Sequence, residues 1–210
     1  MITVRRCVAL GAVACALAPG ASPAAEPDAP LETSFSLTGS YYAMRDEPDF
    51  GVGVATLDYG RLHLEGRYNY EATNAGSAFV GWKFSGGEDV TFEITPIVGV
   101  LFGAARGVIP GVEASVAWRQ LDVYVEAEYV DDRRQPGSRY FYSWTEIGWT
   151  PQEWLRVGLV GQRTHTVDTG REVQFGAFAQ FTVQKLTFSV YAFNPDSSAR
   201  YVIGALTASF

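Results

Sequence analysis

The chain has 210 residues, of which 47% are hydrophobic and 19% are charged, and its formal net charge at pH 7 is −7. This acidic balance argues against a general nucleic-acid binder, which needs a basic face to neutralise phosphates. After the N-terminal segment, no stretch approaches the about 20 consecutive apolar residues that a transmembrane helix requires. A chain of this composition can still be a membrane protein if apolar and polar residues alternate along strands.

The N-terminal segment has the pattern of a secretory signal peptide. Two arginines are followed by an apolar run over 7–17, which is too short to span a bilayer as a helix, and then by small residues. We expect cleavage after Ala24, so that 1–24 is the signal peptide, 25–32 a short periplasmic segment and 33–210 the folded domain. Export of this kind directs the chain out of the bacterial cytoplasm and toward the outer membrane.

Both cysteines of the chain, Cys7 and Cys15, fall inside this segment. The mature chain would then have no thiol and could hold no disulfide, thiolate metal site or cysteine nucleophile. The residues before Cys15 faintly resemble a lipoprotein cleavage motif but lack its leucine, so we favour ordinary cleavage. The sequence also has no Cys/His cluster with metal-ligand spacing and no phosphate-binding glycine loop before a helix, so we expect no metal and no cofactor.

Beyond residue 30 the dominant pattern is alternation. In the segment 61–71, every even position is apolar, aromatic or glycine, and every odd position is charged or polar. A period of two places the two sets on opposite faces of a strand. A helix does not fit, because Leu62 and Leu64 would lie about 200° apart around its axis. The same alternation recurs in 90–95, 121–129, 172–181 and 186–191.

Turn residues divide the chain into about twelve strands, with ten or fourteen as the alternatives. In chain order we expect strands over 33–44, 49–59, 61–71, 76–85, 89–103, 107–119, 121–131, 139–149, 154–165, 171–183, 185–193 and 200–210. Pro96 and Pro110 lie inside the fifth and sixth of these strands. Because proline weakens a ladder, we expect those two strands to be bulged or shorter than drawn.

The connections between the strands alternate in length. Tight turns are expected at 59–60, 86–88, 120, 150–153 and 184, and longer polar loops at 45–48, 72–75, 131–138, 166–170 and 194–198. Short turns on one side and longer loops on the other are the layout of an outer-membrane barrel. The sequence therefore predicts an all-β fold, a transmembrane antiparallel up-and-down β-barrel. An even number of strands places both termini on the short-turn, periplasmic side.

The apolar face of the strands is predicted to contact lipid rather than a dry interior. Charged side chains such as Glu65, Glu113 and Glu126 lie at mid-strand on the polar face, where a wet lumen can solvate or pair them. The apolar face recurs on nearly every strand and would overfill a small soluble barrel. Aromatic residues also cluster toward strand ends, as in the girdles of membrane barrels. These are Tyr41, Tyr59, Tyr68, Tyr70, Trp118, Tyr129, Trp149 and Trp154.

The last predicted strand carries a family signal. The residues that alternate up to the C-terminal phenylalanine are Val202, Gly204, Leu206, Ala208 and Phe210. This pattern resembles the terminal strand of bacterial outer-membrane β-barrel proteins, and the Thr-Pro-Gln-Glu-Trp-Leu turn is similar to periplasmic turns of that class. As an architecture, the resemblance covers the whole mature chain and indicates a small porin-like barrel. It implies recognition of the C-terminal strand by the barrel-assembly machinery, and contact with outer-membrane lipids and lipopolysaccharide.

With the apolar face toward lipid, the polar face lines the lumen. The candidate pore-lining residues are Glu65, Arg67, Glu93, Glu113, Glu126, Glu128 and Glu146. They make the wall from the fifth to the eighth strand acidic, and an acidic constriction favours cations or small neutral solutes. We therefore expect a narrow porin-like channel for passive diffusion. Twelve strands fall between barrels filled by side chains and wide pores, so a closed lumen with a structural or surface-interaction role is the alternative.

A lipid-modifying enzyme of the outer membrane is the rival class. Such chemistry needs a nucleophile and a base, or carboxylates with a histidine. His63 is expected in the lumen beside Arg61 and Glu65, as part of a polar network. His165 is expected at the external rim near Asp168, but no His-x-Ser motif accompanies it. We therefore expect the chain not to be an enzyme.

Overall fold

The computed structural model describes residues 32–134, 139–166 and 170–210, and the regular elements within these ranges are β-strands. The strands are β1 (Thr33–Met44), β2 (Phe50–Tyr59), β3 (Leu62–Tyr68), β4 (Ala75–Trp82), β5 (Phe84–Gly86), β6 (Val90–Gly103), β7 (Gly107–Trp118), β8 (Leu121–Asp132), β9 (Tyr140–Gln152), β10 (Leu155–Thr166), β11 (Gly170–Val183), β12 (Leu186–Phe193) and β13 (Tyr201–Ser209). In these ranges no helix is long and apolar enough to cross a membrane. The predicted signal peptide lies outside the described residues.

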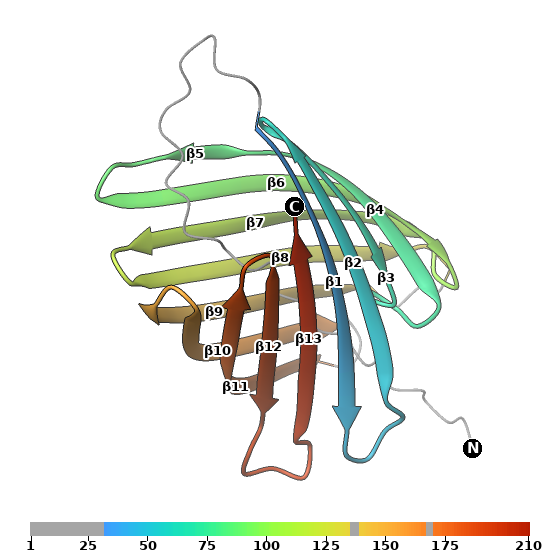
Figure 1. Ribbon diagram of the computed structural model, residues 1–210. Coiled ribbons are helices and arrows are strands. Elements are labelled where there is room, and N and C mark those ends of the chain that lie inside the picture. The colour runs from blue at the N-terminus through green and yellow to red at the C-terminus, as the bar shows by residue number, and fades with distance from the viewer. Residues whose placement is uncertain (1–31, 135–138, 167–169) are drawn as a thin grey trace, which may run out of the picture.

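Strand pairing closes the sheet into an antiparallel barrel with 12 strands in the ring (Figure 1). The first and last strands complete it, because β1 pairs with β13 from Ser36↔Ser209 to Met44↔Tyr201. The other ring strands pair with their neighbours in chain order, so the up-and-down topology that alternation predicted is confirmed. One turn is tighter than expected, since β9 runs on to Gln152 before the chain reverses.

The strand β5 lies outside the ring count because it continues β4 along the same partner, β6 (Figure 1). Both segments pair with β6 in one unbroken register, with Gly81↔Ile97 in β4 and Phe84↔Ile94 in β5. Pro96 falls opposite the break between them. Proline has no N–H to donate to a ladder, so the pairing is interrupted on the β4 side while the pairing of β6 with β7 continues.

Pro110 produces the same kind of gap on the next strand. The β7–β8 pairing is in register at Val108↔Asp131 and again at Gly111↔Glu128, and the pairs between them are missing. The predicted weakening of these ladders is therefore confirmed. The strands are neither bulged nor shortened at the prolines, since β6 has 14 residues and β7 has 12 and the register is kept across each gap. Among the described pairs, a register shift occurs instead between β9 and β10.

The outer face of the barrel is apolar, as the sequence predicted. Side chains such as Leu159, Phe175 and Val183 are 64%, 67% and 70% exposed, and similar residues recur around the ring. In a bilayer this surface contacts lipid chains, so its exposure carries no cost there. Seven of the predicted girdle aromatics also point outward, namely Tyr41, Tyr59, Tyr68, Trp118, Tyr129, Trp149 and Trp154.

The assignment of Tyr70 to this outer girdle is wrong. Its side chain is 2% exposed, and its hydroxyl donates a hydrogen bond to Glu126 at 2.6 Å. The strand β3 ends at Tyr68, and the next residue, Asn69, has φ +60°. A residue in the left-handed region breaks the two-residue alternation. Whether a later residue has an odd or even number (its parity) then no longer decides which way its side chain points. The turn carries Tyr70 over the lumen instead.

Candidate functional site: the charged lumen

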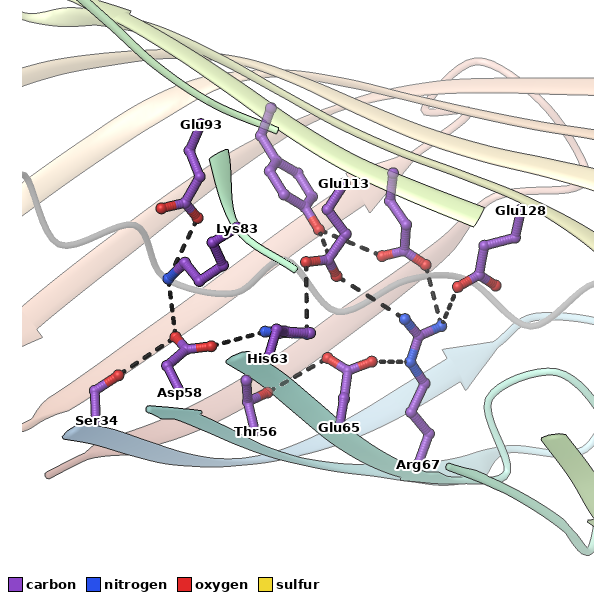
Figure 2. A network of polar contacts seen from close by, with 12 residues as sticks. Ser34, Thr56, Asp58, His63, Glu65, Arg67, Lys83, Glu93, Glu113 and Glu128 are labelled. Carbon is purple, nitrogen blue, oxygen red and sulfur yellow. Dashed lines mark hydrogen bonds and ion pairs between the residues drawn. The ribbon is translucent and has the colours of Figure 1, made fainter. Parts of the chain in front are cut away.

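Arg67, on the inner face of β3, is the centre of the larger charged cluster in the lumen (Figure 2). Its guanidinium donates hydrogen bonds to Glu65 on the same strand and to Glu126 and Glu128 on β8, the last two at 3.2 and 2.7 Å. On each strand the two residues are two positions apart, so alternation places both on one face. The fork of guanidinium donors can serve several carboxylates at once, and here it joins two strands that are not neighbours in the ring.

Two further carboxylates and two rings complete the surroundings of this guanidinium. Carboxylate oxygens of Glu71 and Glu113 lie 3.5 and 4.0 Å from its terminal nitrogens. The rings of Tyr70 and Phe79 face it at 4.2 and 4.3 Å, within the range of cation–π attraction. Arg67 is therefore a single fixed cation among five carboxylates. The cluster thus has more acidic groups than the one guanidinium can neutralise.

A chain of polar contacts leads from this cluster toward the short-turn end of the barrel (Figure 2). The ammonium of Lys83 lies 3.4 Å from Glu93 and 3.0 Å from Asp58. The other oxygen of Asp58 lies 2.8 Å from Nδ1 of His63, whose Nε2 is 3.8 Å from Glu113. Ionisable groups thus form an unbroken series from the mouth of the barrel to its middle.

A second, smaller cluster surrounds Arg156 on β10. Its guanidinium donates hydrogen bonds to both oxygens of Asp122, to Glu146 at 2.6 Å and to Gln180 at 3.0 Å. The ring of Phe178 lies 4.7 Å from the guanidinium carbon. Here two carboxylates meet one cation, so the charge is closer to balanced than around Arg67.

Aromatic side chains fill much of the remaining lumen, and the sequence analysis missed them. Trp144 is fully buried, with its ring centre 5.4 Å from that of Tyr191 and 5.5 Å from that of Phe193. Phe193 in turn stacks on Tyr201 at 4.8 Å. A signal was present, because Trp144 lies two residues before Glu146 and must share its face. The sequence analysis considered aromatic residues only as candidates for the outer girdle and did not assign Trp144 to either face.

The structure places all seven predicted pore-lining residues on the inner face of the barrel. Glu65, Arg67, Glu113, Glu126 and Glu128 belong to the Arg67 cluster, Glu146 to the Arg156 cluster, and Glu93 to the chain that reaches the mouth. Whether solutes pass beside them is a separate matter and stays a prediction. Arg61, which was expected in the lumen beside His63, is exposed at a turn instead, and Arg119 is likewise exposed at a turn. The backbone of Arg119 has φ +56°, which ends the alternation there.

The two histidines lie in different environments. His63 is 5% exposed and belongs to the lumen network, as expected from its neighbours. His165 is exposed on β10, in register with Arg171 of β11. Asp168, expected near it, lies outside the described residues. The described surroundings of His165 therefore show no nucleophile and base in hydrogen-bond contact.

The closed antiparallel ring, its apolar outer face and its charged interior define a small transmembrane β-barrel with the architecture of outer-membrane barrels. Solved structures with this fold include the KdgM porin in complex with disordered oligogalacturonate, with a TM-score of 0.68, 10% identity, and coverage of 83% of this chain and 99% of that one. The KdgM porin alone gives a TM-score of 0.67 at 10% identity with the same coverage. OpdK from Pseudomonas aeruginosa gives 0.46 at 11% identity, covering 84% of this chain and 66% of that one. No protein-family model and no curated protein sequence matches the chain.

Proposed function

We propose that this protein is a narrow outer-membrane channel through which small solutes diffuse passively, with a preference for cations. The observation that carries the proposal is the excess of buried acid in the lumen. The carboxylates of the two clusters and the connecting chain are Asp58, Glu65, Glu71, Glu93, Glu113, Asp122, Glu126, Glu128 and Glu146. In the part of the chain that the structure describes, the permanently charged groups paired with them are Arg67, Lys83 and Arg156, and His63 contacts Asp58 and Glu113.

This imbalance supports a conducting lumen because buried charge is costly unless it is paired or hydrated. A barrel that served only as a scaffold could fill its interior with apolar side chains at no such cost. Surplus carboxylates instead attract mobile cations and raise their local concentration. The KdgM porin has been solved with oligogalacturonate, a ligand that carries carboxylates of its own. The acidic lumen of the present chain would repel such a ligand, so we propose a different class of solute for it.

A closed barrel is the second candidate, and the aromatic packing favours it. Trp144, Tyr191 and Phe193 are each less than 2% exposed, so they occupy space that a wide pore would leave to water. Any open path therefore runs beside the Arg67 cluster rather than through these rings. The same experiment separates the two candidates.

Planar-bilayer recording of the refolded protein in a potassium chloride gradient tests the proposal. We expect small, ohmic conductance steps and a reversal potential of the sign that cations give. Glu113→Gln removes one of the carboxylates beside Arg67 and should shift the reversal potential toward zero. The matched control is Glu153→Gln, which makes the same change in an exposed turn outside the lumen and should leave it unchanged. An anion-selective current would contradict the acidic-lumen mechanism, and a silent bilayer would favour the closed barrel.

We also propose that the chain reaches the outer membrane by signal-peptide-directed export and is assembled there through its C-terminal strand. The backbone of Phe210 exchanges two hydrogen bonds with Phe35, at 2.8 and 3.1 Å, and the two rings lie 6.2 Å apart. The C-terminal residue thus sits at the seam where the ring closes. Deleting Phe210 should lower the folded yield in outer-membrane fractions of a bacterial host, whereas an unchanged yield would remove this assembly role.

A further inference from the structure

The Nε2 atom of His63 is buried and has no hydrogen-bond partner among the described residues. It lies near two carboxylates, those of Glu65 and Glu113. The Nδ1 atom of the same ring lies 2.8 Å from Asp58, and a neutral imidazole bound in this way carries its proton on Nδ1 and uses that N–H as the hydrogen-bond donor to the carboxylate. The Nε2 atom then carries no proton and has a lone pair available, and the whole residue is 5% exposed.

The lone pair points at other acceptors rather than at a donor. Nε2 lies 3.8 Å from a carboxylate oxygen of Glu113, which is too long for a hydrogen bond. Glu65 completes the group, and one ligand atom from each of the three residues lies within 4.8 Å of the other two. Arg67 already donates to Glu65 and lies 4.0 Å from Glu113, but no donor among the described residues reaches Nε2 of His63, which leaves that lone pair for a further cation.

We infer that His63, Glu65 and Glu113 form a binding site for a divalent transition-metal ion of the zinc type. One imidazole nitrogen and two carboxylate oxygens are ligands that zinc accepts at about 2.0–2.2 Å, with a fourth position left for water. Ligand atoms around a tetrahedral zinc are about 3.4 Å apart at those bond lengths. The observed separations are somewhat larger, so rotation of the flexible glutamate side chains would bring the oxygens into range.

The residues behind the three ligands have the arrangement that metal sites use to orient them. A metal-bound histidine usually donates its other ring N–H to a carboxylate, and Asp58 occupies that place, held by Lys83 at 3.0 Å. The remaining oxygens of the two glutamates are held as well. Thr56 donates to Glu65 at 3.3 Å, and Tyr124 donates to Glu113 at 3.4 Å. The other oxygen of Glu65 accepts from Arg67, so the ion would share that carboxylate with the guanidinium, whereas Oε2 of Glu113 faces Nε2 of His63.

The site lies in the lumen and spans it, because His63 and Glu65 are on β3 whereas Glu113 is on β7. The ring strands β4 and β6 lie between them, so the ion would tie non-adjacent strands across the interior. Binding requires only the folded barrel, whereas any effect on conductance rests on the proposed channel. Failure of the channel proposal would therefore leave the metal site standing, and the reverse also holds.

Isothermal titration of the refolded, metal-stripped barrel with zinc chloride alone tests the site. We expect one ion per chain, and a cobalt(II) substitute should show visible absorption typical of a four-coordinate ion with nitrogen and oxygen ligands. His63→Gln should weaken binding at least about 100-fold, and Asp58→Asn, which removes only the orienting contact, about 10- to 100-fold. The matched control His165→Gln changes the other, exposed histidine and should bind zinc like the wild type.

Glu113→Gln provides a second variant of nearly the same shape, in case His63→Gln does not fold. Folding of each variant is checked by far-ultraviolet circular dichroism and heat-dependent gel mobility. The site is refuted if zinc does not bind stoichiometrically, or if binding survives in folded His63→Gln and Glu113→Gln. Equal loss in His165→Gln would also refute it, because the metal would then lie at the rim. Zinc block of the wild-type current that is absent from His63→Gln would add support from the channel side.

Discussion

The Arg67 cluster gives the sharpest test of how the lumen is held together. In Arg67→Met the side chain keeps much of its length but loses its charge and its hydrogen bonds to three carboxylates. Removing one partner of a buried ion pair costs about 3–5 kcal/mol, because the charge left behind is uncompensated. Arg67 serves several carboxylates, so we expect a loss of at least about 3 kcal/mol, equivalent to a more than roughly hundredfold change in the folding equilibrium.

Urea titration of the barrel refolded into lipid vesicles, followed by tryptophan fluorescence, measures this loss. The control Arg133→Met makes the same substitution in an exposed loop, where the pair with Asp131 spans 3.8 Å and should contribute less than about 1 kcal/mol. Adding Glu126→Gln and Glu128→Gln to Arg67→Met should restore more than half of the lost stability, because the stranded charges are then gone. A folded Arg67→Met barrel as stable as the wild type, or no recovery in the triple variant, would refute this account of the cluster.

Three single sites give further predictions. Gly158→Ala should lower the free energy of unfolding by about 1–3 kcal/mol through overpacking, because the added methyl carbon would lie 2.0 Å from a backbone oxygen. In the control Gly53→Ala the added carbon meets nothing within 4 Å, so its free energy of unfolding in the same assay should be unchanged. Trp144→Ala should destabilise the barrel by about 3–5 kcal/mol and raise conductance, because it opens space beside the existing path, and an unchanged current in the folded variant would contradict the view that this ring blocks part of the lumen. The hydrogen bond from Tyr41 lowers the pKa of Asp49 in the exposed β1–β2 loop, so its support of the loop should be present above the usual aspartate pKa and disappear as the pH falls through the lowered one. Carboxyl NMR titration would show this shift, and a pKa at or above the usual value would contradict it.

The sequence predicted the barrel well because period-two alternation is a local property. The bounds expected for β1, 33–44, agree with Thr33–Met44, and most other strands differ by a residue or two. Parity fails where a single backbone residue leaves the extended region. Asn69, with φ +60°, reverses the orientation of the residues after it. Asparagine favours this conformation, but the alternation on both sides of it outweighed that local signal in the prediction of β3.

The contacts inside the lumen were not predictable in the same way. Parity placed Glu126 and Arg67 on inner faces, but which strands oppose one another across the interior depends on the shape of the closed ring. Their 3.2 Å contact joins residues 59 positions apart in the chain, and nothing local encodes it. The aromatic packing beside the Arg156 cluster was also not predicted, because Trp144 was not assigned to a face although it lies two residues before Glu146.

The contacts that cross the lumen also have a mechanical consequence. A ring of strands resists stretching along its hydrogen bonds, but it flattens easily because flattening breaks none of them. The guanidinium of Arg67 joins β3 to β8, and the tilted contact between the rings of Trp144 and Phe193 joins β9 to β12, so both brace the ring across its interior. They fix the cross-section against lateral pressure from the bilayer. The width of any passage would then be set by the length of the side chains that make these two contacts across the lumen, rather than by the number of strands.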